Sequence, residues 1–541
     1  MLNSNTVPNW TARIIREIKS TVHSQISLVI ENGASPSVGS AGRLLRNPKH
    51  LLWKLYSALD YRLFRETDDP FQRVSVADEL DGIPRLRVSP EMTRFRDRFP
   101  AEAIETIRGY ELDVAIRFGF RILDGDVLKI ARFGVWSFHH GDNEVNRGGP
   151  PGFWEVALGE PVTGSVLQIL SSNLDAGRVI YRSWSSTHPY SVVANQTRFY
   201  YKSAAFIGRK LRDLAQQGET ALKCIQCDSS QYRPYFHPLY QPPSNRQMMG
   251  FLFRLGARGM RAMMQNAFHR GAWKIAYKIS KSSGLPTRLH DFKPLIPPKD
   301  RVWADPFPVS HDGKRYIFVE EALHRFKNAH ISVLEMNEDG SWKPPAKVLQ
   351  RPYHLSYPFV FRWNQQFYMI PETKGNNSVE LYRATNFPHD WTLEKVLLEN
   401  VKAVDATVED IDGRWWMFVG MAERGAPFQD ELHLYYADSP LGPWQAHPRN
   451  PVKSDVRSAR PAGRLFQYGN EWYRPAQDGS VRYGYAITLN QITKITSEEF
   501  DEEEISKILP KWRKGLMGTH TFNHHAGLTV VDEFYYRPRI F

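Results

Sequence analysis

The sequence predicts a multidomain protein with an α/β N-terminal half and an all-β C-terminal half. Its 541 residues exceed the length of one ordinary domain. Up to about residue 220, apolar strand-like runs alternate with amphipathic helix-like runs. From residue 301 onward, pairs of aromatic strands recur with a period of about 50 residues, which is typical of a β-propeller. We therefore expect an α/β domain over 1–220, a basic connector over 221–298 and a five-bladed β-propeller over 299–541.

Composition narrows the class of protein and of partner. Hydrophobic residues make up 42% and charged residues 24% of the chain, which is typical of a globular protein. The formal net charge of +12 favours anionic partners such as sugar nucleotides, phospholipid surfaces, nucleic acid or folate polyglutamate. Cys224 and Cys227 are the two cysteines, so a four-cysteine zinc site within one chain is excluded. The sequence shows neither a signal peptide nor an 18-residue apolar run, which favours a cytoplasmic protein.

The N-terminal half reads as alternating helices and strands, with only a short segment ahead of the first helix. This alternation predicts a mostly parallel sheet with ligands at the strand ends. The first strand of such a domain is then missing or badly shortened. Helices are expected at 10–20, 43–66, 99–110, 121–131, 151–160 and 191–217, and strands at 25–33, 112–120, 134–138, 164–170 and 177–186.

One stretch of this half, 134–177, combines several chemically meaningful residues. It contains His139 at a strand end, then Arg147 in a glycine-rich loop, and closes on Asp175. The pattern resembles the formyltransferases that use 10-formyltetrahydrofolate, with G-x-x-N-x-H, R-G, G-E-x-x-T-G and L-D-x-G in register. Ser137 stands where that family has Asn.

The resemblance implies a Rossmann-like formyltransferase domain and assigns roles to individual residues. In the family the His and its Asp partner handle the proton of the attacking amine, so His139 and Asp175 are the expected catalytic pair, with Ser137 replacing the amide. Arg147 is expected on the substrate side, and no metal is expected. The residues expected to line the folate pocket are Phe118, Gly119, Ile122, Asn173 and Leu174.

The connector carries a strongly basic, methionine-rich segment. Over 241–300, Lys and Arg outnumber Asp and Glu by eleven to two. The segment 246–270 predicts an amphipathic helix that either packs between domains or lies on an anionic membrane surface. We expect packing, with peripheral contact to the inner face of the membrane as the alternative.

The C-terminal half resembles the propeller of the glucosamine inositolphosphorylceramide transferase family and, more distantly, five-bladed glycosidases. The segments WADPF, HLSYPF, MIPET, ARPAG and YRPAQD carry the resemblance. Because strand starts face the central channel of a propeller, a polar ring is expected there. Its expected members are Asp305, Glu372, Asp405, Arg460, Gln477 and His525, of which the first four are expected to contact substrate.

These observations lead to one functional expectation and its alternatives. The first is transfer of a formyl group from 10-formyltetrahydrofolate to an amino sugar on a nucleotide, surface glycan or glycolipid. Nucleic acid is not expected as a partner, since the tRNA-contacting barrel of the methionyl-tRNA enzymes does not follow. The alternatives are a carbohydrate-binding or scaffold protein that has lost catalysis, and a glycan-modifying propeller that resembles glycosidases or glycosyltransferases.

Overall fold

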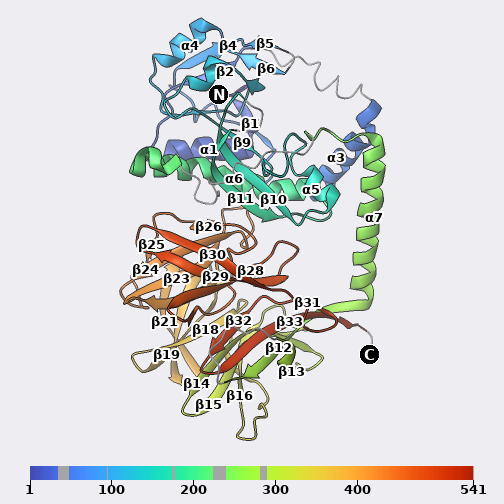
Figure 1. The fold of residues 1–541 in the computed structure, drawn as a ribbon, viewed down its shortest axis with the longest axis vertical. Helices are drawn as coiled ribbons and strands as arrows, with labels where there is room; N and C mark the ends of the chain where they lie inside the picture. The colour runs from blue at the N-terminus through green and yellow to red at the C-terminus, as the bar shows by residue number, and fades with distance from the viewer. Residues whose placement is uncertain (35–47, 94, 173–176, 223–238, 281–288, 540–541) are drawn as a thin grey trace. The chain divides into compact units, whose positions relative to one another are not determined.

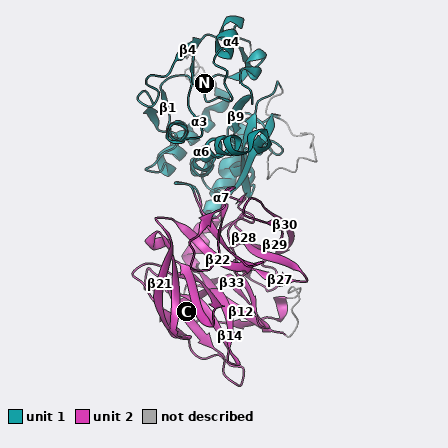
Figure 2. Cartoon of the chain, turned by 90° about the vertical axis from the view of Figure 1, so that its left-hand side faces the viewer, with its two compact units in different colours: residues 1–260, 423–426 teal, residues 261–422, 427–541 magenta. Residues whose placement is uncertain are grey.

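The computed structural model describes residues 1–34, 48–93, 95–172, 177–222, 239–280 and 289–539. Two compact units are present: residues 1–260 with 423–426, and residues 261–422 with 427–541 (Figure 2). The expected connector is divided between them, because its helix begins in the first unit and its strands belong to the second. Across the described part of the chain, no helix is both long and apolar enough to cross a bilayer.

The first unit is α/β and contains several short sheets (Figure 1). Its elements are β1 (Thr6–Pro8), α1 (Asn9–Ser20), β2 (Val29–Asn32), α3 (Leu51–Phe64), β3 (Arg73–Ser75), β4 (Arg85–Val88), β5 (Glu91–Met92), β6 (Arg96–Arg98), α4 (Ala101–Arg108), β7 (Ala115–Ile116), β8 (Ile122–Leu123), β9 (Val135–His139), α5 (Phe153–Leu158), β10 (Val162–Ile169), β11 (Arg178–Ser186), α6 (Val192–Gln217) and α7 (Asn245–Phe268).

The expectation of a mostly parallel sheet is wrong for this unit. In the largest sheet, of order β11-β10-β9-β7, only β7 and β9 are parallel, and β9, β10 and β11 are antiparallel. The other parallel pairs, β2 with β4 and β6 with β8, lie in separate sheets. The helix expected at 121–131 is instead β8 and one 3-10 turn, because Gly125 adopts a φ of 84° between them.

Helix α6 is the main apolar support of this unit. Its N-terminus is capped by Ser191, whose side chain accepts a hydrogen bond from the Ala194 amide at 3.0 Å. Phe206 and Ile207 pack with Trp136 of β9 and Ile14 of α1, all fully buried. The helix thereby joins α1 to the sheet that carries His139 and Ser137.

The second unit is mainly β: besides the last two turns of α7 and two short 3-10 helices, its regular elements are strands in the described residues. Its strands are β12 (His269–Ile279), β13 (Lys293–Leu295), β14 (Arg301–His311), β15 (Lys314–Leu323), β16 (His330–Glu335), β17 (Ala346–Leu349), β18 (Ser356–Trp363), β19 (Gln366–Glu372), β20 (Ser378–Asn386), β21 (Asp390–Glu399), β22 (Ala403–Ile411), β23 (Arg414–Met421), β24 (Glu431–Ala437), β25 (Gln445–Ala446), β26 (Lys453–Ser454), β27 (Phe466–Tyr468), β28 (Glu471–Asp478), β29 (Ala486–Ile495), β30 (Phe500–Ile508), β31 (Leu516–Gly518), β32 (Phe522–His525) and β33 (Leu528–Pro538).

These strands form antiparallel sheets in sequence order, which gives the unit a propeller-like plan. The sheets are β14-β15-β16-β17, β18-β19-β20-β21, β22-β23-β24-β25 with β26, β27-β28-β29-β30, and β13-β12-β33-β31 with β32. The last sheet joins the two ends of the unit, because β12 pairs with β33 from His269↔Pro538 to Ile279↔Leu528. The recurring strand pairs in the sequence predicted most of these strands, whereas β12 lies in the segment expected to be a connector.

The seam between β12 and β33 gives a stability prediction. Ile275 is fully buried and packs with Val530 and Trp303, so Ile275→Ala should lower the free energy of unfolding of this unit by about 2–5 kcal/mol. Urea unfolding followed by tryptophan fluorescence measures the effect. Ile279→Ala on the same strand is the control, because that side chain is exposed, and it should cost less than about 1 kcal/mol. Equal effects of the two substitutions would contradict the assigned seam.

Candidate functional site

The first strands of three consecutive sheets share one local distortion. The register of β14 is interrupted between Ala304 and Phe307, and the same break occurs in β18 and β22. The central residues of these bulges, Asp305, Tyr357 and Asp405, have positive φ values of 48°, 45° and 55°. Bulges re-aim side chains, and these three residues make hydrogen bonds to other sheets of the unit.

Asp305 joins three sheets. Its carboxylate accepts a hydrogen bond from the Tyr357 amide at 3.2 Å and one from the Thr521 hydroxyl at 2.5 Å. The Tyr357 hydroxyl lies 2.7 Å from the Thr407 hydroxyl of β22. The bulge residues are therefore linked to one another through the centre of the unit.

A second group of contacts surrounds Asp405. Its Oδ2 atom accepts a hydrogen bond from Arg460 Nε at 2.5 Å and one from Gln477 Nε2 at 2.8 Å. Arg460 Nη2 also lies 3.5 Å from Glu372 Oε2, and Lys374 Nζ lies 3.3 Å from Glu372 Oε1. Asp405, Glu372 and Arg460 are all buried, so one guanidinium balances two carboxyl groups away from water.

His520 forms a third group with Asp532. The two side chains make an ion pair through His520 Nδ1, and His520 Nε2 lies 3.8 Å from Asp305 Oδ1. The amides of His520 and Thr521 donate to Asp532 Oδ1 at 2.8 and 3.1 Å. Trp273 of β12 stacks on the imidazole, with 4.1 Å between ring centroids. These contacts hold the imidazole in a fixed orientation.

The protonation behaviour of the centre follows from this burial. Burial raises the pKa of Glu372 to about 7, and the negative charge of Asp405 adds to the effect. Burial also raises the pKa of Asp305 to about 7, although His520 opposes the shift. Burial alone would lower the pKa of His520, but the carboxylates of Asp532 and Asp305 raise it to about 9. Near neutral pH, the centre therefore holds a cationic imidazole and two carboxyl groups that can carry a proton.

Exposed side chains lie beside this buried centre. Tyr483 is 46% exposed, and its ring contacts both the Arg460 guanidinium, at 5.2 Å, and the His520 ring. Lys374 Nζ lies 5.1 Å from the Phe428 ring centroid, and His354 pairs with Glu320 at 3.3 Å. An exposed aromatic ring over a polar base can stack on a sugar face while the polar groups bind hydroxyls.

Asp305, His520 and Asp532 could also be considered as metal ligands. One ligand atom from each lies within 4.8 Å of the others, the only such group among the residues the structure describes. His520 already pairs with Asp532 and lies 3.8 Å from Asp305, and Asp532 Oδ1 accepts hydrogen bonds from the His520 and Thr521 amides. The donor set therefore fits an ion-pair network better than a cation site.

Of the residues expected in the formyl-transfer site, the structure describes His139, Ser137 and Arg147. His139 is buried at the end of β9, and its Nε2 lies 2.8 Å from the Asn146 carbonyl. Ser137, on the same strand, accepts a hydrogen bond from Arg117 Nε at 3.0 Å. Arg147 Nε donates to the Asn143 carbonyl at 2.8 Å. Asp175, Asn173 and Leu174 lie outside the described residues, as do Cys224 and Cys227.

The structure describes three of the expected folate-pocket residues, Phe118, Gly119 and Ile122. Phe118 packs edge-on against Trp10 and lines a cavity of about 730 Å³ together with Ile15 and Val114. His139 and Ser137 are not among the described residues that line it. Gly119 lies against the N-terminal segment, where an added Cβ atom would come within 2.7 Å of Asn3. Ile122 lies on β8, in a different sheet from His139.

In the second unit, the structure connects the expected polar ring through ion pairs and hydrogen bonds. Asp405 directly contacts Arg460 and Gln477, Arg460 contacts Glu372, and Asp305 joins through Tyr357 and His520. Among the described residues, His525 makes no hydrogen bond or ion pair with this network, and burial and the nearby Arg464 lower its pKa to about 4. His520 is the histidine of this polar network, in place of His525. The sequence carried this signal, because His520-Thr521-Phe522 starts a strand pair as Asp305-Pro306-Phe307 does.

By its fold and its buried polar centre, the chain is a multidomain, mostly β protein whose second unit has a propeller-like plan. Residues 297–530 then match the family model described as "Glucosamine inositolphosphorylceramide transferase 1, N-terminal". This confirms the resemblance inferred for the C-terminal half.

Two plant proteins illustrate the relationship. The rice (Oryza sativa subsp. japonica) glucosamine inositolphosphorylceramide transferase 1 is 36% identical over 226 residues, which cover 41% of this chain and 30% of the rice protein. The Arabidopsis thaliana protein of the same name is 34% identical over 255 residues, covering 45% and 31%. The chain thus spans about a third of the length of the curated relatives it matches.

Two solved structures are similar at much lower levels. Zg3597, a family 117 glycoside hydrolase from Zobellia galactanivorans, is 15% identical with a TM-score of 0.32, covering 49% of this chain and 90% of that one. The family 43 β-xylosidase/α-arabinofuranosidase CoXyl43, from a compost metagenome, is 14% identical with a TM-score of 0.33, covering 44% and 90%. No inference follows from TM-scores this low.

The relatives contradict the expectation of formyl transfer. They are transferases named for glucosamine and inositolphosphorylceramide, which indicates glycosyl transfer and not transfer of a formyl group. Since 10-formyltetrahydrofolate was expected only as the donor in formyl transfer, we do not propose it as a cofactor. The alternative of a carbohydrate-binding or glycan-modifying second unit fits these relatives better.

Removing the cation from the buried centre should destabilise the second unit. Arg460→Leu leaves Asp405 and Glu372 buried without their guanidinium, so the free energy of unfolding should fall by about 3–5 kcal/mol. Arg383→Leu is the matched control, because Arg383 makes a partly exposed ion pair with Glu394 worth about 0.2–1 kcal/mol. Urea unfolding at pH 7 distinguishes them. A loss below 1 kcal/mol for Arg460→Leu would show that the centre tolerates unbalanced carboxylates.

The raised pKa of Glu372 predicts a pH dependence of stability. The folded-state pKa of about 7 exceeds the ordinary value of 4.5, so protonated Glu372 favours the folded state. This contribution to the free energy of unfolding is complete below pH 4.5 and is lost as pH rises through 7. The free energy of unfolding of the wild type should therefore fall between pH 4.5 and 7.5. In Glu372→Gln the side chain cannot ionise, so this fall should be smaller by up to about 3 kcal/mol. Urea unfolding across this range tests it. Glu394→Gln should retain the wild-type slope, and an unchanged slope in Glu372→Gln would refute the assigned shift.

Proposed function

We propose that the second unit is a five-bladed propeller whose centre binds the sugar part of a glycolipid or glycan. The observation that carries the proposal is the set of buried polar groups, contributed by all five sheets, beside the exposed ring of Tyr483. The names of the plant relatives support an amino sugar linked to an inositol phosphate lipid as the substrate class. Asp305, Glu372, Asp405 and Arg460 are the proposed substrate-side residues.

The same centre has the groups needed for glycosyl transfer. Protonated Glu372 would donate its proton to the leaving-group oxygen as the bond between that oxygen and the anomeric carbon breaks. The carboxylate so formed would accept the proton of the incoming hydroxyl as the new glycosidic bond forms. Arg460 and Lys374, both close to Glu372, would stabilise the anionic form between the two steps.

A second candidate is carbohydrate binding without chemistry. This candidate is favoured because two of the carboxylates already accept hydrogen bonds from protein groups. Asp405 accepts from Arg460 and Gln477. Asp305 accepts from Tyr357 and Thr521. A base or nucleophile among these two would have to exchange its present partners for substrate. The two candidates share the same sugar site and differ in turnover.

Binding and turnover separate the candidates. Calorimetry with a glucosaminyl-inositol phosphate headgroup should give saturable binding, and Tyr483→Ala should weaken it about 3- to 10-fold through loss of ring stacking. Tyr468→Ala removes a similarly exposed ring from β27 and should bind as the wild type does. Absence of binding to this headgroup and to a panel of other hexosamine glycans would refute the sugar site.

Turnover is then measured as transfer of radiolabelled sugar between glycolipid and acceptor. Glu372→Gln should reduce the rate about 10²- to 10⁴-fold with little change in affinity, whereas Glu394→Gln should leave it unchanged. Saturable binding with no turnover by the wild type would select the binding protein over the enzyme. Full activity in Glu372→Gln would reject Glu372 as the proton carrier.

A further inference from the structure

Helix α3 belongs to the first unit, helix α7 begins there and ends in the second, and each has one buried side and one exposed apolar side. Their buried sides meet, since Tyr56 of α3 and Phe251 of α7 pack edge to face at 5.0 Å against Phe153 of α5. The Asn245 side chain ties the helix ends together by accepting from the Leu52 amide at 3.0 Å and donating to the Pro48 carbonyl at 2.7 Å. The two helices therefore form one surface feature (Figure 1).

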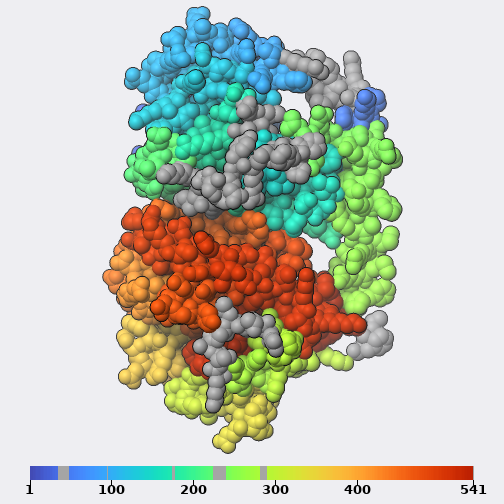
Figure 3. Space-filling view, viewed as in Figure 1, coloured from blue at the N-terminus to red at the C-terminus, as the bar shows by residue number. Residues whose placement is uncertain are grey.

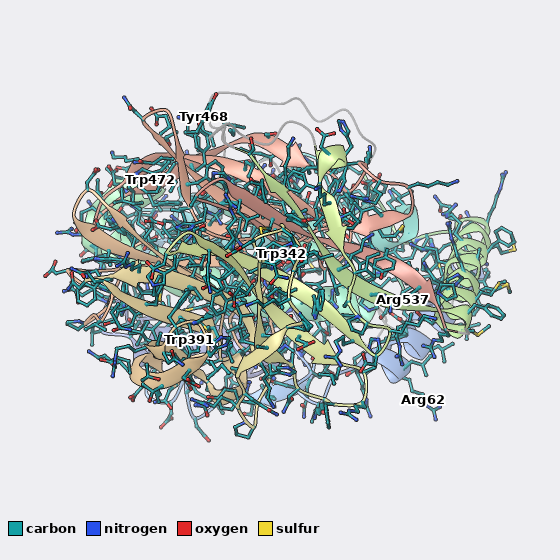
Figure 4. The ribbon with its side chains drawn as sticks, turned by 90° about the horizontal axis from the view of Figure 1, so that it is seen from below. Arg62, Trp342, Trp391, Tyr468, Trp472 and Arg537 are labelled. Atoms are coloured by element: carbon teal, nitrogen blue, oxygen red, sulfur yellow. The ribbon has the colours of Figure 1, made fainter. Side chains whose placement is uncertain are left out.

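The exposed side of α3 is a stripe of leucines. Leu51, Leu55, Leu59 and Leu63 recur at intervals of four residues, so they lie on one face of the helix, and each is at least half exposed. Leu55 is 60% exposed. Arg62 belongs to the same exposed face and points outward in Figure 4. A stripe of this kind normally packs against another element, but here the described chain leaves it uncovered.

The exposed side of α7 is apolar over most of its length. Phe253 is 79% exposed, the largest such value on the helix. The other exposed apolar side chains of α7 are Met249, Leu252, Met260, Met263, Met264 and Phe268. At 100° per residue, these side chains fall within one arc of the helix, opposite Met248 and Phe251. The atoms of α7 lie on the surface along the whole helix in Figure 3.

The exposed charged side chains of the two helices are all basic. Arg62, Arg246, Arg254 and Arg261 are exposed. The only acidic residue within α3 and α7 is Asp60, which is buried and accepts a hydrogen bond from the Val193 amide at 2.8 Å. Arg258 faces inward and donates to the Val156 carbonyl. The apolar arc is therefore flanked by cations with no exposed anion on either helix.

We propose that the exposed faces of α3 and α7 form a docking surface for an anionic lipid bilayer. An interfacial helix buries Leu, Phe and Met side chains among the acyl chains while Arg groups bind lipid phosphates. The charge complementarity favours anionic lipid, because the exposed arginines flank a long apolar arc of Leu, Phe and Met side chains and neither helix has an exposed acid. This inference does not depend on the sugar site of the second unit.

Co-sedimentation of the full chain with vesicles tests the proposal. The vesicles are phosphatidylcholine alone, or phosphatidylcholine with about one third phosphatidylglycerol, at ~0.1 M salt. The wild type should partition at least about tenfold more strongly onto the anionic vesicles. Leu55→Ser with Phe253→Ser should reduce that partition about tenfold or more, and Arg254→Gln with Arg261→Gln should remove most of the preference for anionic lipid.

Matched controls keep the test specific. Met92→Ser with Phe326→Ser removes two similarly exposed apolar side chains elsewhere and should leave partition unchanged. Equal thermal midpoints among the variants exclude unfolding as the cause of a loss. The proposal is overturned if the wild type does not sediment with anionic vesicles, or if Leu55→Ser with Phe253→Ser binds as well as the wild type. A wild-type dimer in lipid-free buffer that this double substitution dissociates would also overturn it, by assigning the face to a second copy.

Discussion

The ion pair between Asp405 and Arg460 is the interaction on which the centre of the second unit depends. Four acidic side chains, Asp305, Glu372, Asp405 and Asp532, are buried there with two bases, Arg460 and His520. Arg460 lies closer to Asp405 than to Glu372, and His520 lies closer to Asp532 than to Asp305, so Asp305 and Glu372 are the less closely balanced acids. These two are the acids whose pKa burial raises to about 7. Burial, reinforced by the excess of acid over base, thus explains why two carboxyl groups can hold protons near neutral pH.

The backbone makes this concentration of charge possible. Each bulge turns a residue of an inner strand out of its sheet, and the repeated bulge places Asp305, Tyr357 and Asp405 in a connected set. The flanking side chains are large and apolar, with Phe307 and Phe359 fully buried beside Tyr357. A rigid apolar surround lowers the local dielectric, so that each ion pair and each unpaired acid has a large effect on its neighbours.

Repetition is what made the second unit predictable from sequence. Short aromatic strand pairs with small or polar starts indicated both the sheets and most of the polar centre, including Asp405 and Arg460. The seam strand β12 was missed because its only long partner, β33, is far away in the sequence. His520 was missed in favour of His525, since both lie in one short segment and the register of the last strand pair decides between them. In the first unit, the motif around His139 matched in spacing, but spacing could not show that its Nε2 faces the Asn146 carbonyl.

Pairing of β12 with β33 also constrains how the second unit is made during translation. Residues 269–279 leave the ribosome early, yet their longest hydrogen-bonded partner, residues 528–538, is synthesised some 250 residues later. At ~5–20 residues per second, this strand waits on the order of ten seconds or more for its neighbour. Throughout that interval the edge of β12 is unpaired on that side and open to intermolecular pairing. The nascent chain therefore has a period of aggregation risk that ends only when β33 emerges.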